Sequence, residues 1–138
     1  MDKPLKPELQ AAISSYPATV QQQVLRLRDE ILEVAAGSEG VGELLETLKW
    51  GELSFVTEQS KSGSTLRVAW NAKQAEYLGL YVNCKTSLVN SYQTLFPGLF
   101  VYQKQRALLL PLDSEWPLAE LRICIAMALR YHLDKRKR

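Results

Sequence analysis

The sequence predicts an α+β fold, a mostly antiparallel sheet of about five strands packed by N-terminal and C-terminal helices. Two observations carry this prediction. Apolar residues recur every three or four positions in the first third of the chain and again near its end, as on amphipathic helices. Between these regions, apolar and polar residues alternate in short runs, as in half-buried strands. We therefore expect the terminal helices to cover one face of a central sheet.

Three helices are expected before the sheet. The first covers residues 7–15, and the third covers residues 41–50, where Gly51 follows as a stop. The second, residues 17–36, has apolar positions at spacings of four, three, four and three, and these are Val20, Val24, Leu27, Ile31 and Val34. The chain should therefore pass from helix to sheet at Trp50-Gly51.

The middle of the chain has the period of two that is typical of strands. Expected strands lie around residues 53–55, 66–70, 77–82, 99–103 and 107–112. A helix over residues 86–96 interrupts them, and a last helix starts at Pro117. This order gives an antiparallel sheet with one inserted helix and a helix at the end.

Length and charge limit the class of protein. The 138 residues fit a single domain, with a core at about residues 16–132 and a basic tail at 134–138. The net charge of +2 is too small to indicate nucleic-acid or membrane binding by itself. No apolar run approaches the ~20 residues of a membrane span, and the first residues lack a signal-peptide hydrophobic region. We expect a cytoplasmic protein, with Cys84 and Cys124 as reduced thiols in or near the core.

Several segments carry a resemblance to one family. They are residues 25–32, 46–55, 106–112 and 117–121. With these segments the chain resembles the YdhG-like family of small bacterial domains of unknown function, from about Tyr16 to His132. The best signature is Lys49-Trp50-Gly51 after a helix that holds Glu46. Family members usually continue with a proline and an aromatic residue, and here Leu53 takes the place of the proline and Phe55 that of the aromatic residue.

This resemblance implies a sheet packed by terminal helices, in agreement with the pattern above. Some relatives are called frataxin-like iron chaperones. That activity rests on acidic surface residues rather than on a fixed ligand motif, so the resemblance carries over no ligand position by position.

An acidic region gives the first candidate site. Carboxylates three or four positions apart can share one helical face and bind a hard cation such as ferrous iron. The candidate metal ligands are Asp29, Glu30, Glu33 and Glu43. The alternative is an ordinary solvated helix face.

The expected helix–sheet junction gives the second candidate site. A pocket between helix and sheet would bind a small molecule or a peptide. The candidate ligand-binding residues are Glu46, Lys49, Trp50, Gly51, Trp70, Tyr81 and Tyr102. In the alternative interpretation Trp50 caps the core, Gly51 provides a turn, and Glu46 pairs with Lys49.

The remaining groups limit the chemistry. A basic stretch, formed by Arg130, Lys135, Arg136, Lys137 and Arg138, could touch an acidic partner, but no aromatic platform for nucleic acid accompanies it. His132 is the only histidine and has no nucleophile near it in sequence.

The preferred hypothesis is a non-enzymatic binding protein for a small ligand or protein partner. We expect no binding to nucleic acid or membranes. A homodimer formed through a sheet edge is compatible with the sequence but not required by it. The first alternative is an iron chaperone that binds iron weakly and has no other cofactor. The second is an enzyme whose site the sequence does not reveal.

Overall fold

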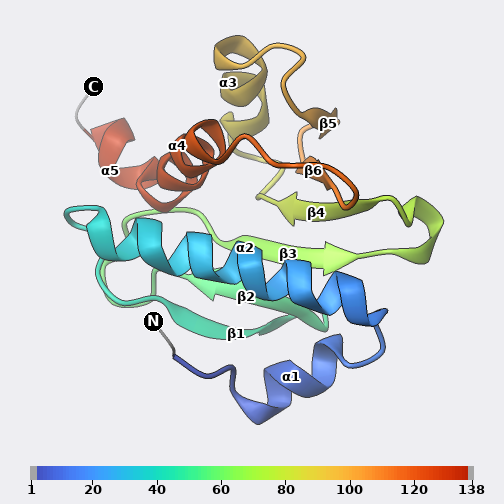
Figure 1. Cartoon of the computed structure of the whole chain (residues 1–138). Helices are drawn as coiled ribbons and strands as arrows, with labels where there is room; N and C mark the ends of the chain where they lie inside the picture. The colour runs from blue at the N-terminus through green and yellow to red at the C-terminus, as the bar shows by residue number, and fades with distance from the viewer. Residues whose placement is uncertain (1–2, 137–138) are drawn as a thin grey trace.

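The structure is a computed structural model that describes residues 3–136 (Figure 1). Two helices come first, α1 (Pro7–Ile13) and α2 (Ala18–Gly37). The next elements are β1 (Leu45–Lys49), β2 (Glu52–Val56), β3 (Leu66–Trp70), the 3-10 helix η1 (Ala72–Gln74) and β4 (Tyr77–Tyr81). The last elements are α3 (Leu88–Leu95), β5 (Val101–Gln103), β6 (Ala107–Pro111), α4 (Leu118–Leu129) and α5 (Tyr131–Arg136).

The strands form one six-stranded sheet in the order β1-β2-β3-β4-β6-β5, with every neighbouring pair antiparallel. The long helix α2 packs on β3 and β4, and α4 packs beside it (Figure 1). The predicted α+β class and the packing of terminal helices on the sheet are therefore confirmed, with six strands where about five were expected.

The two faces of the sheet differ because residues paired across antiparallel strands point to the same side. On the helix-covered face, Phe55 lies between Glu46 and Leu66, and these three side chains are buried. The opposite face, called the open face below, is defined by Thr47, Lys49, Glu52, Ser54, Arg67, Gly79, Tyr81, Val101, Gln103, Ala107 and Leu109.

The predicted helix over residues 41–50 is wrong. Residues 45–49 form β1, which pairs in register with β2. Gly40 and Gly42, with φ of 86° and 73°, hold the chain in conformations that a helix does not use. Trp50 and Gly51 are the two central residues of the β1–β2 hairpin, and both have positive φ, as in a type I′ turn. The chain therefore makes a β-turn there, not a helix-to-sheet junction.

The other expected helices are present with small changes at their ends. The stripe of α2 is buried at Val20, Val24, Leu27 and Ile31, as expected. The C-terminal segment differs, because Tyr131–Arg136 forms the short helix α5 and so includes the start of the basic tail that was expected from residue 134 onward. Lys137 and Arg138 lie outside the described residues.

The two cysteines have different surroundings. Cys124 on α4 is fully buried, and desolvation raises the pKa of its thiol to about 12. Cys84 is exposed, so the expectation of a thiol in or near the core holds for Cys124 and is wrong for Cys84. No helix within residues 3–136 combines enough length with enough apolar side chains for a bilayer crossing.

Candidate functional site

The open face carries a row of neighbouring side chains from four strands. In this row Arg67 of β3 lies between Ser54 of β2 and Tyr81 of β4, and Tyr81 lies opposite Ala107 of β6. Ser54 and Ala107 are fully buried, whereas Arg67 and Tyr81 are partly exposed. Small residues in the row therefore form a floor, and the two long side chains lie above it.

The ring of Tyr81 lies along its own strand, over Gly79. A Cβ atom at Gly79 would come within 2.4 Å of the Tyr81 Cε1 atom. The Tyr81 ring can therefore lie there only because residue 79 is a glycine, which has no side chain. The Arg67 guanidinium carbon is 5.3 Å from the centre of this ring, and that of Arg106 is 5.8 Å from it. Tyr81 therefore makes cation–π contacts with two arginines.

The two arginines differ in their charge balance. Arg67 forms an ion pair with Glu52 of β2. Arg106, in the turn between β5 and β6, is exposed and forms no ion pair within residues 3–136. Its positive charge is therefore available to a ligand.

These groups line a cavity of about 400 Å³. The cavity extends to the end of β3, where Tyr16 and Asn71 add polar groups to its wall. The Tyr16 hydroxyl oxygen accepts a hydrogen bond from the Trp70 backbone N–H at 3.3 Å. The Tyr16 and Trp70 rings meet edge to face with their centres 5.7 Å apart. The short segment between α1 and α2 thus closes one side of the cavity.

The Tyr16 hydroxyl keeps its proton in this position. Desolvation raises the pKa of Tyr16, the Trp70 N–H opposes this shift, and the negative charge of Glu52 adds to it. A protonated phenol can donate a hydrogen bond. The cavity therefore offers guanidinium and hydroxyl donors, and its one carboxylate is already paired with an arginine. Such a donor set suits a carboxylate or a phosphate group.

The predicted ligand-binding residues are spread over three places. Trp70 and Tyr81 line the cavity, and Lys49, Trp50 and Gly51 lie at the β1–β2 hairpin end. The other two, Glu46 and Tyr102, lie on the helix-covered face. The Tyr102 hydroxyl donates to the backbone oxygen of Phe96 at 2.7 Å, which holds it against the end of α3.

Trp50 lies in water, with 90% of its surface exposed. The alternative that it caps the core is therefore wrong, and so is the idea that it covers a pocket between helix and sheet. Its backbone has a φ of 57°, which is the left-handed conformation. This conformation is unfavourable in free energy for any residue that has a Cβ atom.

This turn leads to a stability prediction. Asparagine tolerates the left-handed conformation well, so Trp50→Asn should raise the free energy of unfolding by about 1 kcal/mol. Urea denaturation of the two proteins measures this. Trp50→Ala is the control, because alanine removes the exposed ring but keeps the backbone strain. Equal stability of the Asn and Ala variants would show that the turn is not strained.

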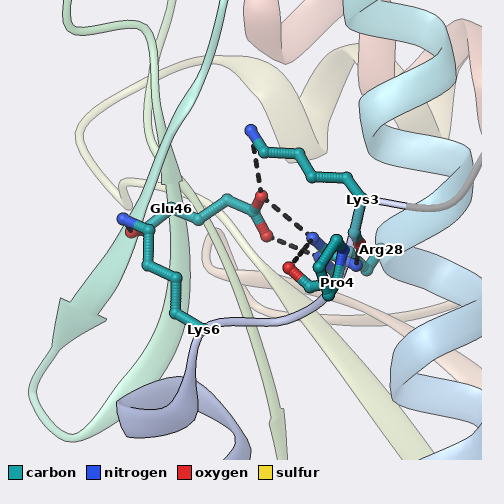
Figure 2. Close-up of polar contacts among 5 residues, drawn as sticks. All are labelled: Lys3, Pro4, Lys6, Arg28 and Glu46. Atoms are coloured by element: carbon teal, nitrogen blue, oxygen red, sulfur yellow. Dashed lines mark hydrogen bonds and ion pairs between the residues drawn. The ribbon is translucent and has the colours of Figure 1, made fainter.

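Glu46 belongs to a polar cluster that joins the N-terminal segment, α2 and β1, and in which Arg28 and Glu46 are buried (Figure 2). Arg28 Nε donates to Glu46 Oε1 at 2.6 Å, and Arg28 Nη1 donates to the backbone oxygen of Lys3 at 2.8 Å. The Lys3 ammonium lies 3.6 Å from Glu46 Oε2, and the Lys6 ammonium donates to the Glu46 backbone oxygen at 3.0 Å. The expected pairing of Glu46 with Lys49 is therefore replaced by a structural cluster.

The four candidate metal ligands are not gathered around one point. Glu30 turns toward α4, where it accepts a hydrogen bond from Arg122 Nε at 2.6 Å. The other three, Asp29, Glu33 and Glu43, line a second cavity beside α2. Within residues 3–136 no three acidic, histidine or cysteine side chains lie close enough to hold a metal ion together.

The C-terminal candidates have structural contacts. The Arg130 guanidinium donates to the backbone oxygen of Glu39, and its Nη2 lies 3.4 Å from Asp134 Oδ1. The Lys135 ammonium lies 5.4 Å from the centre of the Tyr131 ring. The His132 backbone N–H donates to the Ser62 oxygen, which fixes α5 against the loop after β2.

Sequence reasoning missed Tyr16, Glu52, Arg67 and Arg106 as a group. The available signal was the alternation in residues 66–70 and 77–81, which places Arg67 and Tyr81 on the polar side of their strands. Their contact also depends on the register between β3 and β4, which the alternation does not contain.

Comparisons of the chain with protein-family models, with curated proteins and with solved structures found no match. The resemblance to the YdhG-like family therefore stays a prediction.

Proposed function

We propose that this chain is a non-enzymatic binding protein that holds a small anionic ligand, of the carboxylate or phosphate type, in the cavity on the open face. The observation that carries the proposal is the exposed guanidinium of Arg106, which faces the Tyr81 ring and lacks an ion pair within residues 3–136. An anion bridging Arg106 and the protonated Tyr16 would supply the missing negative charge.

Binding is favoured over catalysis by the composition of the cavity wall. Within residues 3–136 no cysteine or histidine lines it, and its carboxylate, Glu52, is neutralised by Arg67. The arginines and tyrosines can orient an anion through hydrogen bonds, and within residues 3–136 neither Tyr16 nor Tyr81 donates its hydroxyl to a base that would make it a nucleophile. A cavity of about 400 Å³ is also large enough for a small ligand.

The proposal is tested by calorimetric titration with three probes: inorganic phosphate, pyrophosphate and citrate. We expect at least one of them to bind the unmodified protein, and Arg106→Ala to weaken that binding by about tenfold or more, since a charge-assisted hydrogen bond is lost. Lys85→Ala is the control, because it removes one positive charge from an exposed loop outside the cavity.

A second variant separates the cavity from net charge. Gly79→Ala leaves all charges in place but must push the Tyr81 ring aside. It should weaken anion binding while the protein stays folded. If Arg106→Ala and Lys85→Ala bind each probe equally well, or if no probe binds, the proposed function is wrong.

The wider assignments belong to the same proposal. We infer a bacterial cytoplasmic protein of the YdhG-like family, on the resemblance of residues 16–132, without nucleic-acid or membrane partners. A homodimer through the edge strand β1 is disfavoured, because the Lys6 ammonium already donates a hydrogen bond to the Glu46 backbone oxygen on that strand. Iron binding has no support from the positions of the carboxylates.

A further inference from the structure

The charges in the wall of the open-face cavity limit the charge of its ligand. Arg67 and Arg106 line the cavity, and Glu52 is the one carboxylate of the lining within residues 3–136. Tyr16 keeps its proton and adds no charge. Two positive charges therefore face one negative charge, which leaves a single positive charge to be balanced. A ligand with one carboxylate balances it, whereas a dianion or trianion brings an excess of negative charge.

The wall also offers hydrogen bonds to uncharged groups of a ligand. Asn71 directly follows β3, and its side-chain oxygen accepts a hydrogen bond from the Lys73 backbone N–H at 2.9 Å. This bond turns the oxygen toward the backbone. The amide nitrogen, which has two N–H donors, is therefore the part of the side chain that is left for a ligand. It can bind a hydroxyl group of the ligand without adding charge to the wall.

Glu52 provides an acceptor in the same cavity. Its Oε1 atom accepts a hydrogen bond from Arg67 Nη1, which holds the carboxylate in place. Its Oε2 atom accepts no hydrogen bond from any other group of residues 3–136. A carboxylate oxygen accepts a hydrogen bond from a hydroxyl group, but it repels a second negative charge. Hydroxyl groups of a ligand therefore suit the place beside Glu52, and its charged group suits the place beside Arg106.

Carbon atoms of a ligand have surfaces to pack on as well. Three aromatic side chains, Tyr16, Trp70 and Tyr81, line the cavity. Carbon-bound hydrogens pack well on aromatic rings, because the ring faces carry partial negative charge. The volume of about 400 Å³ suits a molecule of a few carbon atoms with polar substituents.

On the basis of the anion site described under the proposed function, we propose that its ligand is a small sugar acid, a single carboxylate on a carbon skeleton that carries several hydroxyl groups. The carboxylate binds at Arg106, and hydroxyl groups bind at Asn71 and Glu52. Each polar part of the ligand then meets a group of matching charge or hydrogen-bonding type. An alkyl carboxylate would displace water from Asn71 and Glu52 without replacing its hydrogen bonds, which lowers affinity.

The test is calorimetric titration of the full chain with gluconate, in a buffer free of phosphate and carboxylates. Hexanoate is the matched control for the hydroxyl groups, because it has the same charge and the same number of carbon atoms. Glucose is the control for the charge. We expect gluconate to bind at least about tenfold more tightly than hexanoate or glucose, since each of these lacks one half of the recognition. Gluconate should also bind more tightly than phosphate.

Asn71→Ala tests the contact with the hydroxyl groups. This variant should weaken gluconate binding by about fivefold, the effect of one hydrogen bond, and leave hexanoate binding unchanged. Asn83→Ala is the matched control. The Asn83 side-chain oxygen accepts the same kind of bond, from the Lys85 backbone N–H at 2.9 Å, in an exposed loop outside the cavity. Equal losses for gluconate and hexanoate in Asn71→Ala would overturn the proposal.

The titrations separate failure of the sugar-acid assignment from failure of the proposed function. If gluconate binds no more tightly than hexanoate, while Arg106→Ala weakens the binding of both, the anion site stands and the sugar-acid assignment is wrong. Tighter binding of phosphate than of gluconate has the same meaning. If the unmodified protein binds none of the anions, both proposals are wrong.

Discussion

Replacing Gly63 with alanine is expected to destabilise the protein by about 3 kcal/mol or more. A Cβ atom at Gly63 would come within 2.2 Å of the Leu129 backbone oxygen and 2.3 Å of the Ala128 backbone oxygen. Both neighbours are backbone atoms of α4, so no side-chain rotation can relieve the overlap. Either the loop after β2 or the end of α4 must move.

Such a movement would break several hydrogen bonds at once. The Ser64 N–H donates to the Ala128 oxygen at 2.8 Å, and the Ser62 hydroxyl donates to the Leu129 oxygen at 2.7 Å. These bonds add partners for carbonyl groups in the last turn of α4, where few helical N–H groups remain to bond them. The loop therefore serves as the cap of α4, and Gly63 allows the close approach.

Urea denaturation followed by circular dichroism measures the effect. Gly37→Ala is the control, because a Cβ atom there would meet nothing within 4 Å and the residue lies in α2. That variant should be neutral or more stable by up to about 1 kcal/mol. If Gly63→Ala were as stable as Gly37→Ala, the described contact between loop and helix would be wrong.

The second large effect is expected for Glu46→Gln, which should lower the free energy of unfolding by about 3 kcal/mol. The substitution keeps the size of the side chain but leaves the Arg28 guanidinium buried without its negative partner. Arg28 and Glu46 are each 4% exposed, so water cannot replace the lost charge. The N-terminal segment should also loosen, because the Lys3 ammonium pairs with the same carboxylate.

Chemical denaturation again provides the measurement, with Glu30→Gln as the matched control. Glu30 pairs with Arg122, but that arginine is exposed, so the control should lose much less. The double variant Arg28→Met/Glu46→Leu should recover most of the lost stability, since an apolar pair leaves no buried charge. Equal losses for Glu46→Gln and Glu30→Gln would contradict the buried-pair account.

Helix α2 shows what the sequence could predict. Its apolar stripe repeats over about four turns, and this local signal is strong enough to determine both the helix and its buried face. The strands β3 and β4 were predicted for the same reason, since alternation over five residues is also local. Local periodicity therefore predicted the class of fold.

Residues 41–50 show where local periodicity fails. Leu44, Leu45 and Leu48 have helical spacing, yet Leu45 and Leu48 are exposed on an edge strand. The strand exists because β2 pairs with it, and because Trp50 and Gly51 close a tight turn between them. A ten-residue window cannot distinguish these two outcomes.

The candidate site depends on contacts between residues far apart in the chain. Tyr16 reaches Trp70 across 54 positions, and Arg106 reaches Tyr81 from another hairpin. Glu46 pairs with Arg28 at a separation of 18 positions, although Lys49 is its neighbour in sequence. Cross-strand register and helix–sheet packing decide these contacts, and the sequence pattern contains neither.

The most direct test of the proposed anion site is a residue-resolved NMR titration of the full chain with citrate and phosphate. The account predicts that backbone amide signals of Arg67, Asn71, Tyr81 and Arg106 shift together along one saturable curve, while those of α2 beside the second cavity stay in place. Saturable shifts confined to α2, or an open face that does not respond to either anion, would contradict it.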